Sequence, residues 1–178
     1  IIMEYLLGDT LHERLRMSKG RLDTPTLIDL ARQMASVLSA VHAQGIVHRD
    51  LKPTNVMLVP DPEMPHGERV KIVDFGVAKM GSTERPSARP LTPSGIFLGT
   101  PKYMAPEQCQ NACAVDAKAD VYSMGTMLYQ CLVGRPPFTG QGLKTLRDQL
   151  LAEVTPLKQL APQTPLRLAA LIHAMLAK

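Results

Sequence analysis

The amino-acid sequence predicts a mainly α-helical domain with a few short β-strands, an α+β fold. Apolar residues recur at helical spacing from Leu27 to Val41, and a strongly apolar stretch follows Asp116. The runs rich in β-branched residues are short, as at residues 1–5 and 70–73. Polar clusters lie between these stretches, in the loops where catalytic groups tend to occur.

The composition fits one globular domain. The chain has 178 residues, of which 45% are hydrophobic and 20% charged, so it can bury a core. Its net charge of +4 is mild and no run of five basic residues occurs, so the sequence does not indicate nucleic-acid binding. We expect no membrane segment within the chain, because no apolar stretch is long enough and no signal peptide is visible.

The start of the chain predicts a strand and then a short helix. Residues 1–5 are apolar and β-branched, and the run that begins with Gly8 ends the strand. Asp9 or Thr10 can cap a helix that continues to Arg16. A chain that begins inside an apparent strand is expected to be truncated.

The next helix has clear signals at both ends. Thr24 is the expected N-cap, and Pro25 suits the first turn. The apolar positions then continue to Val41, and Gly45 fits just past the end. The segment 46–59 mixes apolar residues with a polar cluster.

The middle of the chain is rich in loop signals. Residues 61–67 are proline-rich and predict a surface loop, and residues 70–73 predict a short strand. Residues 81–95 are rich in Ser, Thr, Pro and Arg without periodicity, which predicts an exposed, mobile segment.

Three helices are expected in the last third of the chain. The strongly apolar helix over 116–133, ended by Gly134 and Pro136, is predicted to lie in the domain centre. Residues 143–151 and 166–177 read as two further helices joined by a proline-containing link.

The three cysteines do not predict a disulfide or a zinc site. Their odd number and the lack of secretory features favour free thiols in a reducing compartment. No pair of histidines accompanies them, as a zinc site would require. The cysteines are Cys109, Cys113 and Cys131.

Two polar clusters carry groups suited to phosphate chemistry. The run from His48 to Asn55 contains Asp50, which can accept a proton, and Lys52, which can offset phosphate charge. Its Asn55 offers an amide oxygen to a hard cation such as Mg²⁺. The second cluster, Asp74-Phe75-Gly76, places a carboxylate directly after a predicted strand.

A third cluster completes the pattern. Gly99-Thr100-Pro101 is followed by Ala105-Pro106-Glu107. The motifs His-Arg-Asp with Asn55, then Asp-Phe-Gly, then Ala-Pro-Glu resemble the protein kinase signature set in its proper order. The chain therefore resembles a bacterial-type serine/threonine protein kinase catalytic domain over essentially its whole length.

The resemblance implies a particular architecture. Residues 1–178 would be a partial kinase domain that is truncated at both ends, comprising a hinge strand and the C-terminal lobe, with the N-terminal lobe missing. Two small strand pairs would surround the catalytic loop, and the buried helix 120–133 would lie at the centre. The lobe interface would be exposed.

The resemblance also implies catalytic roles. Asp50 would be the base that accepts the substrate hydroxyl proton, and Lys52 would stabilise the transferred phosphoryl group. Asn55 and Asp74 would hold Mg²⁺, or Mn²⁺, at the ATP phosphates. Thr100 is expected near Asp50 and Lys52.

An ATP site at the hinge is implied as well. Met3 would be the gatekeeper, and the backbone of Glu4 and Leu6 would bond the adenine edge. Met57 matches the apolar floor beneath the adenine ring. The run Asp9-Thr10 contains the candidates for a contact with the ribose.

Structural and regulatory roles follow in the same way. Asp120 matches the helix aspartate that anchors the catalytic loop, and Glu107 matches a glutamate whose arginine partner is not present in this sequence. The remaining residues of this class are His48, Arg49, Phe75 and Gly76. An arginine beside the catalytic aspartate suggests regulation by phosphorylation of the activation segment, and the candidate sites are Thr92 and Ser94, then Ser82, Thr83 and Ser87.

The implied function is phosphoryl transfer from ATP to Ser/Thr hydroxyls of protein substrates, with autophosphorylation possible. The glycine-rich loop and strand lysine of the family are absent from residues 1–178, so the fragment alone is expected to be inactive. A pseudokinase scaffold is the alternative, although Asp50, Lys52, Asn55 and Asp74 are intact. A cytoplasmic location is expected, either as a separate protein or as the cytoplasmic part of a membrane-anchored kinase.

Overall fold

The computed structural model describes residues 4–75, 101–110, 115–140 and 142–178. This part of the chain is mainly helical with a few short strands, as the sequence predicts. The elements are, in chain order, β1 (Asp9–Thr10), α1 (Leu11–Met17), α2 (Thr24–His42), β2 (Val56–Pro60), β3 (Glu68–Ile72), α3 (Pro106–Gln110), α4 (Ala117–Val133), α5 (Leu143–Leu151), α6 (Leu157–Leu160) and α7 (Leu166–Met175), with 3₁₀ turns at Pro53–Asn55 and Pro101–Tyr103.

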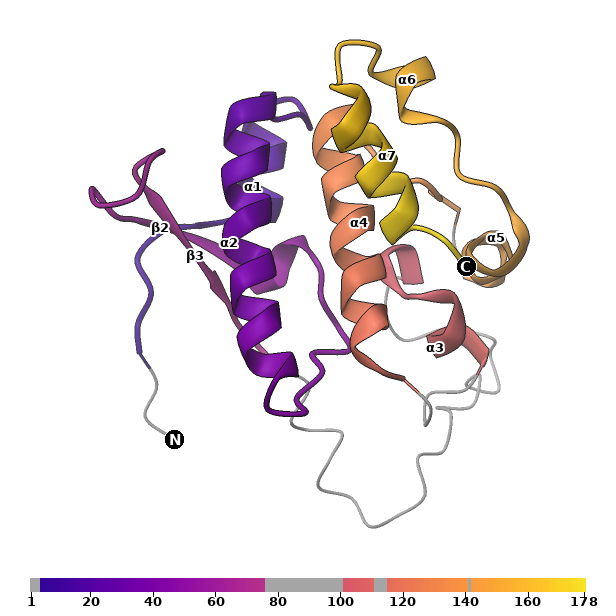
Figure 1. Ribbon diagram of the computed structural model, residues 1–178, viewed down its shortest axis with the longest axis horizontal. Helices are drawn as coiled ribbons and strands as arrows, with labels where there is room; N and C mark the ends of the chain where they lie inside the picture. The colour runs from indigo at the N-terminus through magenta and orange to yellow at the C-terminus, as the bar shows by residue number, and fades with distance from the viewer. Residues whose placement is uncertain (1–3, 76–100, 111–114, 141) are drawn as a thin grey trace.

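The elements lie in layers around two central helices. Figure 1 shows α2 and α4 side by side, with the sheet on the outer side of α2 and α5 to α7 on the outer side of α4. Most residues of α4 from Ala119 to Val133 are buried, and Gly134 ends the helix in a left-handed conformation with φ 91°. The helix at 116–133 thus lies at the domain centre, as predicted.

The sheet differs from the two strand pairs that were expected. It has three antiparallel strands in the order β1-β2-β3, with Asp9 opposite Leu58 and Val56 opposite Ile72. Glu4 and Tyr5, which were predicted to be in a strand, have no regular structure. Gly8 does not end a strand, as was predicted, but allows the chain to approach β2 closely. At its φ of 151°, a Cβ atom would lie 2.2 Å from the Leu58 carbonyl oxygen, so only glycine fits there.

Strand β2 was not predicted, although its residues alternate between buried and half-buried positions. Its pattern is only five residues long and follows a polar cluster, so it lacks a clear boundary signal. The loop 61–67 connects β2 to β3 as expected. The edge of β3 is covered by Gln33 of α2, whose amide accepts from Val70 N–H at 2.8 Å and donates to the Glu68 carbonyl at 3.0 Å.

Helix boundaries mostly follow the predicted caps. Thr10 caps α1 in a reciprocal capping box with Glu13. Helix α2 is capped by Asp23 and not by Thr24, because the Asp23 carboxylate accepts from Thr26 N–H at 3.0 Å. Helix α5 has the predicted bounds, α7 ends at Met175, and the short α3 and α6 were not predicted.

Candidate active site

The loop formed by residues 48–55 is anchored by hydrogen bonds to the first turn of α4. The buried Asp120 carboxylate accepts three hydrogen bonds there. Its Oδ2 accepts from His48 N–H and from His42 Nε2, both at 2.8 Å, and its Oδ1 accepts from Arg49 N–H at 2.9 Å. One buried charge thus joins α4, the end of α2 and loop 48–55.

His48 connects loop 48–55 to the end of β3. Its ring is fully buried and packs against Phe75, with ring centroids 4.8 Å apart. Nε2 lies 2.9 Å from the Val73 carbonyl oxygen and must donate, because a carbonyl only accepts. Nδ1 then accepts from Asp50 N–H at 3.3 Å, so the tautomer is fixed by its neighbours.

The charged groups of Asp50 and Lys52 lie at the surface, outside the buried residues that anchor the loop. Lys52 Nζ donates to Asp50 Oδ2 at 2.8 Å, and the two side chains are 39% and 54% exposed, Lys52 first. A small hollow beside Asp50 is bounded on its other wall by Tyr103, Met104 and Gln108. A hydroxyl group that enters this hollow would meet an acceptor carboxylate and a cation.

Asn55 and Asp74 come to the same end of the β2–β3 hairpin. Val56 pairs with Ile72, and Val73 N–H donates to the Asn55 carbonyl at 2.9 Å, which places Asp74 just beyond Asn55. Asp74 is exposed and left-handed, with φ 58°. The buried Asn55 donates through Nδ2 to the Asp50 carbonyl at 3.0 Å, which ties it to loop 48–55.

These residues fit a divalent cation that is shared with phosphate. Because Asn55 Nδ2 is bonded to the Asp50 carbonyl, its Oδ1 is the atom left to face a cation, and Thr54 Oγ1 approaches it only at 3.3 Å. Among the described residues no group of three His, Cys, Asp or Glu side chains forms a complete metal cage. Mg²⁺ commonly takes one or two protein oxygens and completes its shell with water and substrate phosphates.

A comparison with family models gives a match to the protein kinase domain over residues 1–178. The chain belongs to the protein kinase domain family. Similar curated proteins include the serine/threonine-protein kinases Pkn1 and pkn2 of Myxococcus xanthus, which are 40% and 36% identical over 165 and 163 residues. Serine/threonine-protein kinase PknA of Mycobacterium tuberculosis is 36% identical over 178 residues.

These matches cover most of this chain but a minor part of each relative. They include 93% of the chain for Pkn1, 91% for pkn2 and 100% for PknA. The chain spans 21%, 19% and 38% of the lengths of these three kinases, in the same order.

The residues that the kinase resemblance assigns to ATP lie partly on the outer face of the sheet. Met57 is half-buried on the face opposite Val56 and Leu58, which enter the core. Its cross-strand partner Lys71 donates to the Glu4 carboxylate, so Glu4 lies over the same face. Leu6 is half-buried in the same irregular segment as Glu4.

The two ribose candidates are differently engaged. Thr10 has both its hydroxyl and its N–H bonded to Glu13 in the α1 cap, each at 2.8 Å. Asp9 lies 3.9 Å from Arg14, whose main partner is Glu68. The α1 cap therefore occupies the Thr10 side chain, and Asp9 has the less engaged side chain of the two.

Glu107 lies within the described part of the chain and is half-buried in α3. Other predicted residues fall outside the described part. The predicted residues that lie outside are Met3, Gly76, Ser82, Thr83, Ser87, Thr92, Ser94, Gly99, Thr100 and Cys113.

Sequence reasoning missed residues that hold the site from a distance. Gln108 Nε2 donates to the Arg49 carbonyl at 2.8 Å, and His42 reaches Asp120. Buried Gln149 of α5 donates to the carbonyls of Pro101 and Lys102 at 3.1 and 2.9 Å. Gln108 is the third residue of α3, where a glutamine is a capping signal, but α3 itself was not predicted.

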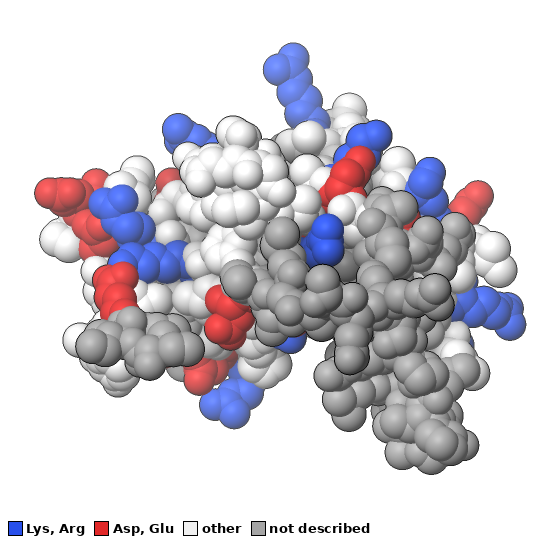
Figure 2. Space-filling model, turned by 90° about the horizontal axis from the view of Figure 1, so that it is seen from below, with Lys and Arg blue, Asp and Glu red and all other residues white. Residues whose placement is uncertain are grey.

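The charges on the described surface are mixed. Figure 2 shows basic and acidic side chains beside one another on the face seen from below. Ion pairs of described residues include Arg14 with Glu68 and Arg69 with Asp61. Among the described residues, no helix has both the length and the apolar character needed to cross a bilayer.

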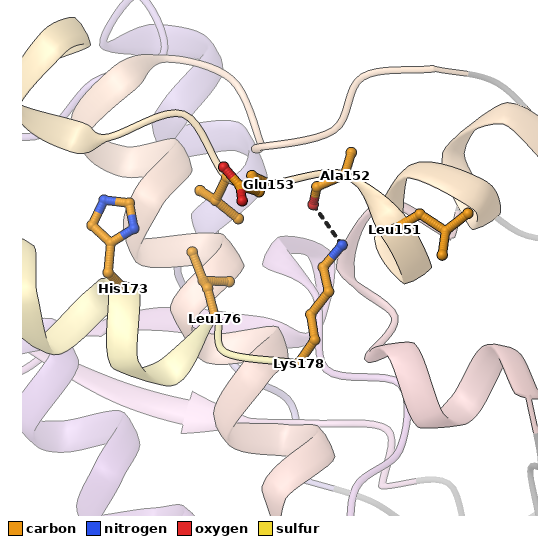
Figure 3. A pocket seen from close by; sticks show the side chains of 7 residues that line it. Leu151, Ala152, Glu153, His173, Leu176 and Lys178 are labelled. Atoms are coloured by element: carbon orange, nitrogen blue, oxygen red, sulfur yellow. Dashed lines mark hydrogen bonds between the residues drawn. The ribbon is translucent and has the colours of Figure 1, made fainter.

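A larger hollow, of about 330 Å³, lies away from loop 48–55, between the end of α5 and the end of α7. Figure 3 shows Lys178 reaching across it, where its Nζ donates to the Ala152 carbonyl at 2.6 Å. Glu153 and His173 are its other polar side chains. It shares no residue with the hollow beside Asp50, so it is not where the kinase motifs converge.

Proposed function

We propose that the chain is the hinge and C-terminal lobe of a bacterial-type serine/threonine protein kinase. The complete protein would transfer the γ-phosphoryl group of ATP to Ser or Thr hydroxyls of protein substrates, itself among them. The observation that carries the proposal is the exposed Asp50 carboxylate, 2.8 Å from Lys52, on a loop anchored by buried Asp120. Family membership and the names of the relatives support the same conclusion.

In this proposal Asp50 accepts the proton of the substrate hydroxyl, while the hydroxyl oxygen attacks the γ-phosphorus of ATP and ADP leaves. Lys52 lies beside Asp50 and offsets negative charge on the transferred group. Asn55 and Asp74 would hold Mg²⁺, or Mn²⁺, against the ATP phosphates. When bound, the metal–nucleotide complex supplies the phosphoryl group and neutralises its charge.

The rest of the assignment belongs to the same proposal. Residues 1–178 contain no match to the family's glycine-rich loop or to its ATP-binding strand lysine, so this piece by itself would not transfer phosphate. Phosphorylation at Thr92 or Ser94 would regulate the kinase by placing a phosphate that pairs with the partly exposed Arg49. The free, half-buried Cys109 and buried Cys131 support a reducing, cytoplasmic location.

The test is phosphate transfer by the complete kinase domain, expressed with the upstream coding sequence. We expect Mg²⁺-dependent formation of phosphoserine or phosphothreonine from labelled ATP. Asp50→Asn should lower kcat by about 10²-fold or more, because the proton acceptor is lost. The matched control is Asp116→Asn, where an exposed N-cap is replaced by a residue that also caps.

Absence of transfer by a folded, nucleotide-binding domain would support the alternative, a pseudokinase scaffold. Equal rates for the parent protein and Asp50→Asn would remove Asp50 as the base.

A further inference from the structure

The peptide that joins Arg49 to Asp50 is held on both of its polar atoms. Its carbonyl oxygen accepts from Gln108 Nε2 at 2.8 Å, and its N–H donates to His48 Nδ1 at 3.3 Å. Arg49 has a left-handed backbone with φ 64°. A residue other than glycine keeps such a conformation only where its surroundings hold it.

Gln108 can hold this peptide because its amide is itself fixed. Oε1 accepts from the N–H of Ala105 at 3.0 Å, and Ala105 is fully buried directly before α3. This contact is half of a capping box, in which a side chain at the third helical position reaches back to the N-cap N–H. If the amide were flipped, its NH₂ group would face the Ala105 N–H, and its oxygen would face the Arg49 carbonyl oxygen.

The same side chain lies in the wall of the hollow beside Asp50. Tyr103 and Met104, from the turn that precedes Ala105, form that wall together with Gln108. Ser123 of α4 donates to the Tyr103 carbonyl at 2.7 Å, so the wall is anchored on the same helix that carries Asp120. The position of Asp50 and the position of the opposite wall are therefore linked through one amide.

We propose that Gln108 is a positioning residue that fixes the plane of the Arg49–Asp50 peptide and so the direction of the Asp50 carboxylate. It ties this direction to the segment 101–105 across the hollow. The inference rests on the proposed function in one respect, because it takes Asp50 as the catalytic base.

The test uses Gln108→Glu in the complete kinase domain. A glutamate has nearly the same shape and caps Ala105 N–H as well as glutamine does. It places an oxygen against the Arg49 carbonyl where a donor is needed, so only the contact with loop 48–55 is lost. Gln159→Glu, at an exposed position of α6, makes the same charge change elsewhere and is the matched control.

Two measurements are made on both variants. The first is the split between kcat and KM: kcat of Gln108→Glu should fall about ten- to a hundredfold, with KM for ATP within about twofold of the parent value. The second is NMR-detected hydrogen exchange, in which the amide protons of Arg49 and Asp50 should exchange about tenfold faster. Gln159→Glu should change neither quantity.

Wild-type kcat and wild-type exchange in Gln108→Glu would overturn the inference and leave Gln108 as a helix cap only. Faster exchange at Arg49 and Asp50 without a change in kcat would also overturn it, because the carboxylate direction would then not depend on the peptide. If the parent protein transfers no phosphate, the proposed function fails. Unchanged exchange in the variant would still refute the positioning role in that case, and faster exchange would uphold its structural part.

Discussion

At the scale of single residues, the buried Asp120 carboxylate joins three parts of the chain. It accepts from the backbone of His48 and Arg49 and from the ring of His42. Loss of Oδ2 as an acceptor would leave His48 N–H and His42 Nε2 without this partner, and loss of Oδ1 would do the same to Arg49 N–H. The shape of loop 48–55 therefore depends on a residue that lies 70 positions further along the chain than Asp50.

Asp120→Asn tests this dependence. The amide keeps one acceptor oxygen and brings an NH₂ group against an N–H donor, so we expect a loss of about 2–4 kcal/mol in the free energy of unfolding. Urea denaturation measures it. Asp116→Asn, at the exposed cap of the same helix, should change this free energy by less than about 0.5 kcal/mol. Equal stability of Asp120→Asn and the parent protein would contradict the role of the carboxylate.

The thiol chemistry of the described cysteines is a second residue-scale prediction. Burial raises the pKa of the Cys109 thiol to about 11 and that of Cys131 to about 12. The neutral thiol is therefore the main form from pH 7 to 9, and reaction with iodoacetamide should be slow until pH approaches 11 or the protein unfolds. Mass spectrometry of the labelled peptides measures the rate. Labelling of Cys109 at pH 7.5 as fast as in urea would contradict the buried environment.

The residues that bear the chemistry were open to prediction because the motifs that contain them are local. Asp50, Lys52 and Asn55 lie within six positions of one another in the sequence. The residues that hold them were not predicted in the same way. Gln108 reaches Arg49 across 59 positions, and no local pattern reports which carbonyl an amide will meet.

At the scale of elements, the helix caps decide where the chain turns. Helix α2 begins one residue earlier than its strongest sequence signal, because Asp23 and not Thr24 provides the accepting side chain. The hydrogen bond from Thr26 N–H lowers the pKa of the Asp23 carboxyl below its usual value. A lowered pKa in the folded state means that the ionised cap stabilises the protein above the pKa of the unfolded state, and that this contribution is lost as pH falls through the folded-state pKa.

Asp23→Ala should therefore lower the free energy of unfolding by about 1 kcal/mol at pH 7. The difference from the parent protein should begin to shrink as pH falls below the unfolded-state pKa of about 4, and should be lost as pH falls through the lower folded-state pKa. Thermal unfolding followed from pH 7 to pH 3 measures the difference. Asp23→Asn is the control, since asparagine caps without ionising. A difference that stays constant over this range would show that the charge of the cap is unimportant.

The long helices were predictable and the short elements were not. Helix α2 carries several turns of apolar periodicity and α4 is apolar over most of its length, and both have clear stop signals, so their existence follows from the sequence. Helix α3 has only five residues, and β1 is a pair of residues that pairs with β2 through the space left by Gly8. Such elements form because of tertiary contacts, which the local sequence does not encode.

At the scale of the whole molecule, the layered arrangement brings the chemistry to one place. The sheet packs on α2, α2 packs on α4, and α4 packs on α7 (Figure 1). Loop 48–55 lies between the end of α2 and β2. Asp120 at the start of α4 and the Val73 carbonyl at the end of β3 can therefore both accept hydrogen bonds from His48. The sequence predicts the central position of α4 but not the single sheet, whose order depends on pairing between residues about 50 positions apart.

The most direct test of the account is transfer of labelled phosphate from ATP by the complete kinase domain with Mg²⁺, measured beside Asp50→Asn. The account predicts phosphorylation of Ser or Thr by the parent protein and a kcat lower by about 10²-fold or more in Asp50→Asn, with nucleotide binding retained. Transfer that is equally fast in Asp50→Asn, or that is absent from a folded parent protein that binds ATP, would contradict the assignment of loop 48–55 as the catalytic loop of an active kinase.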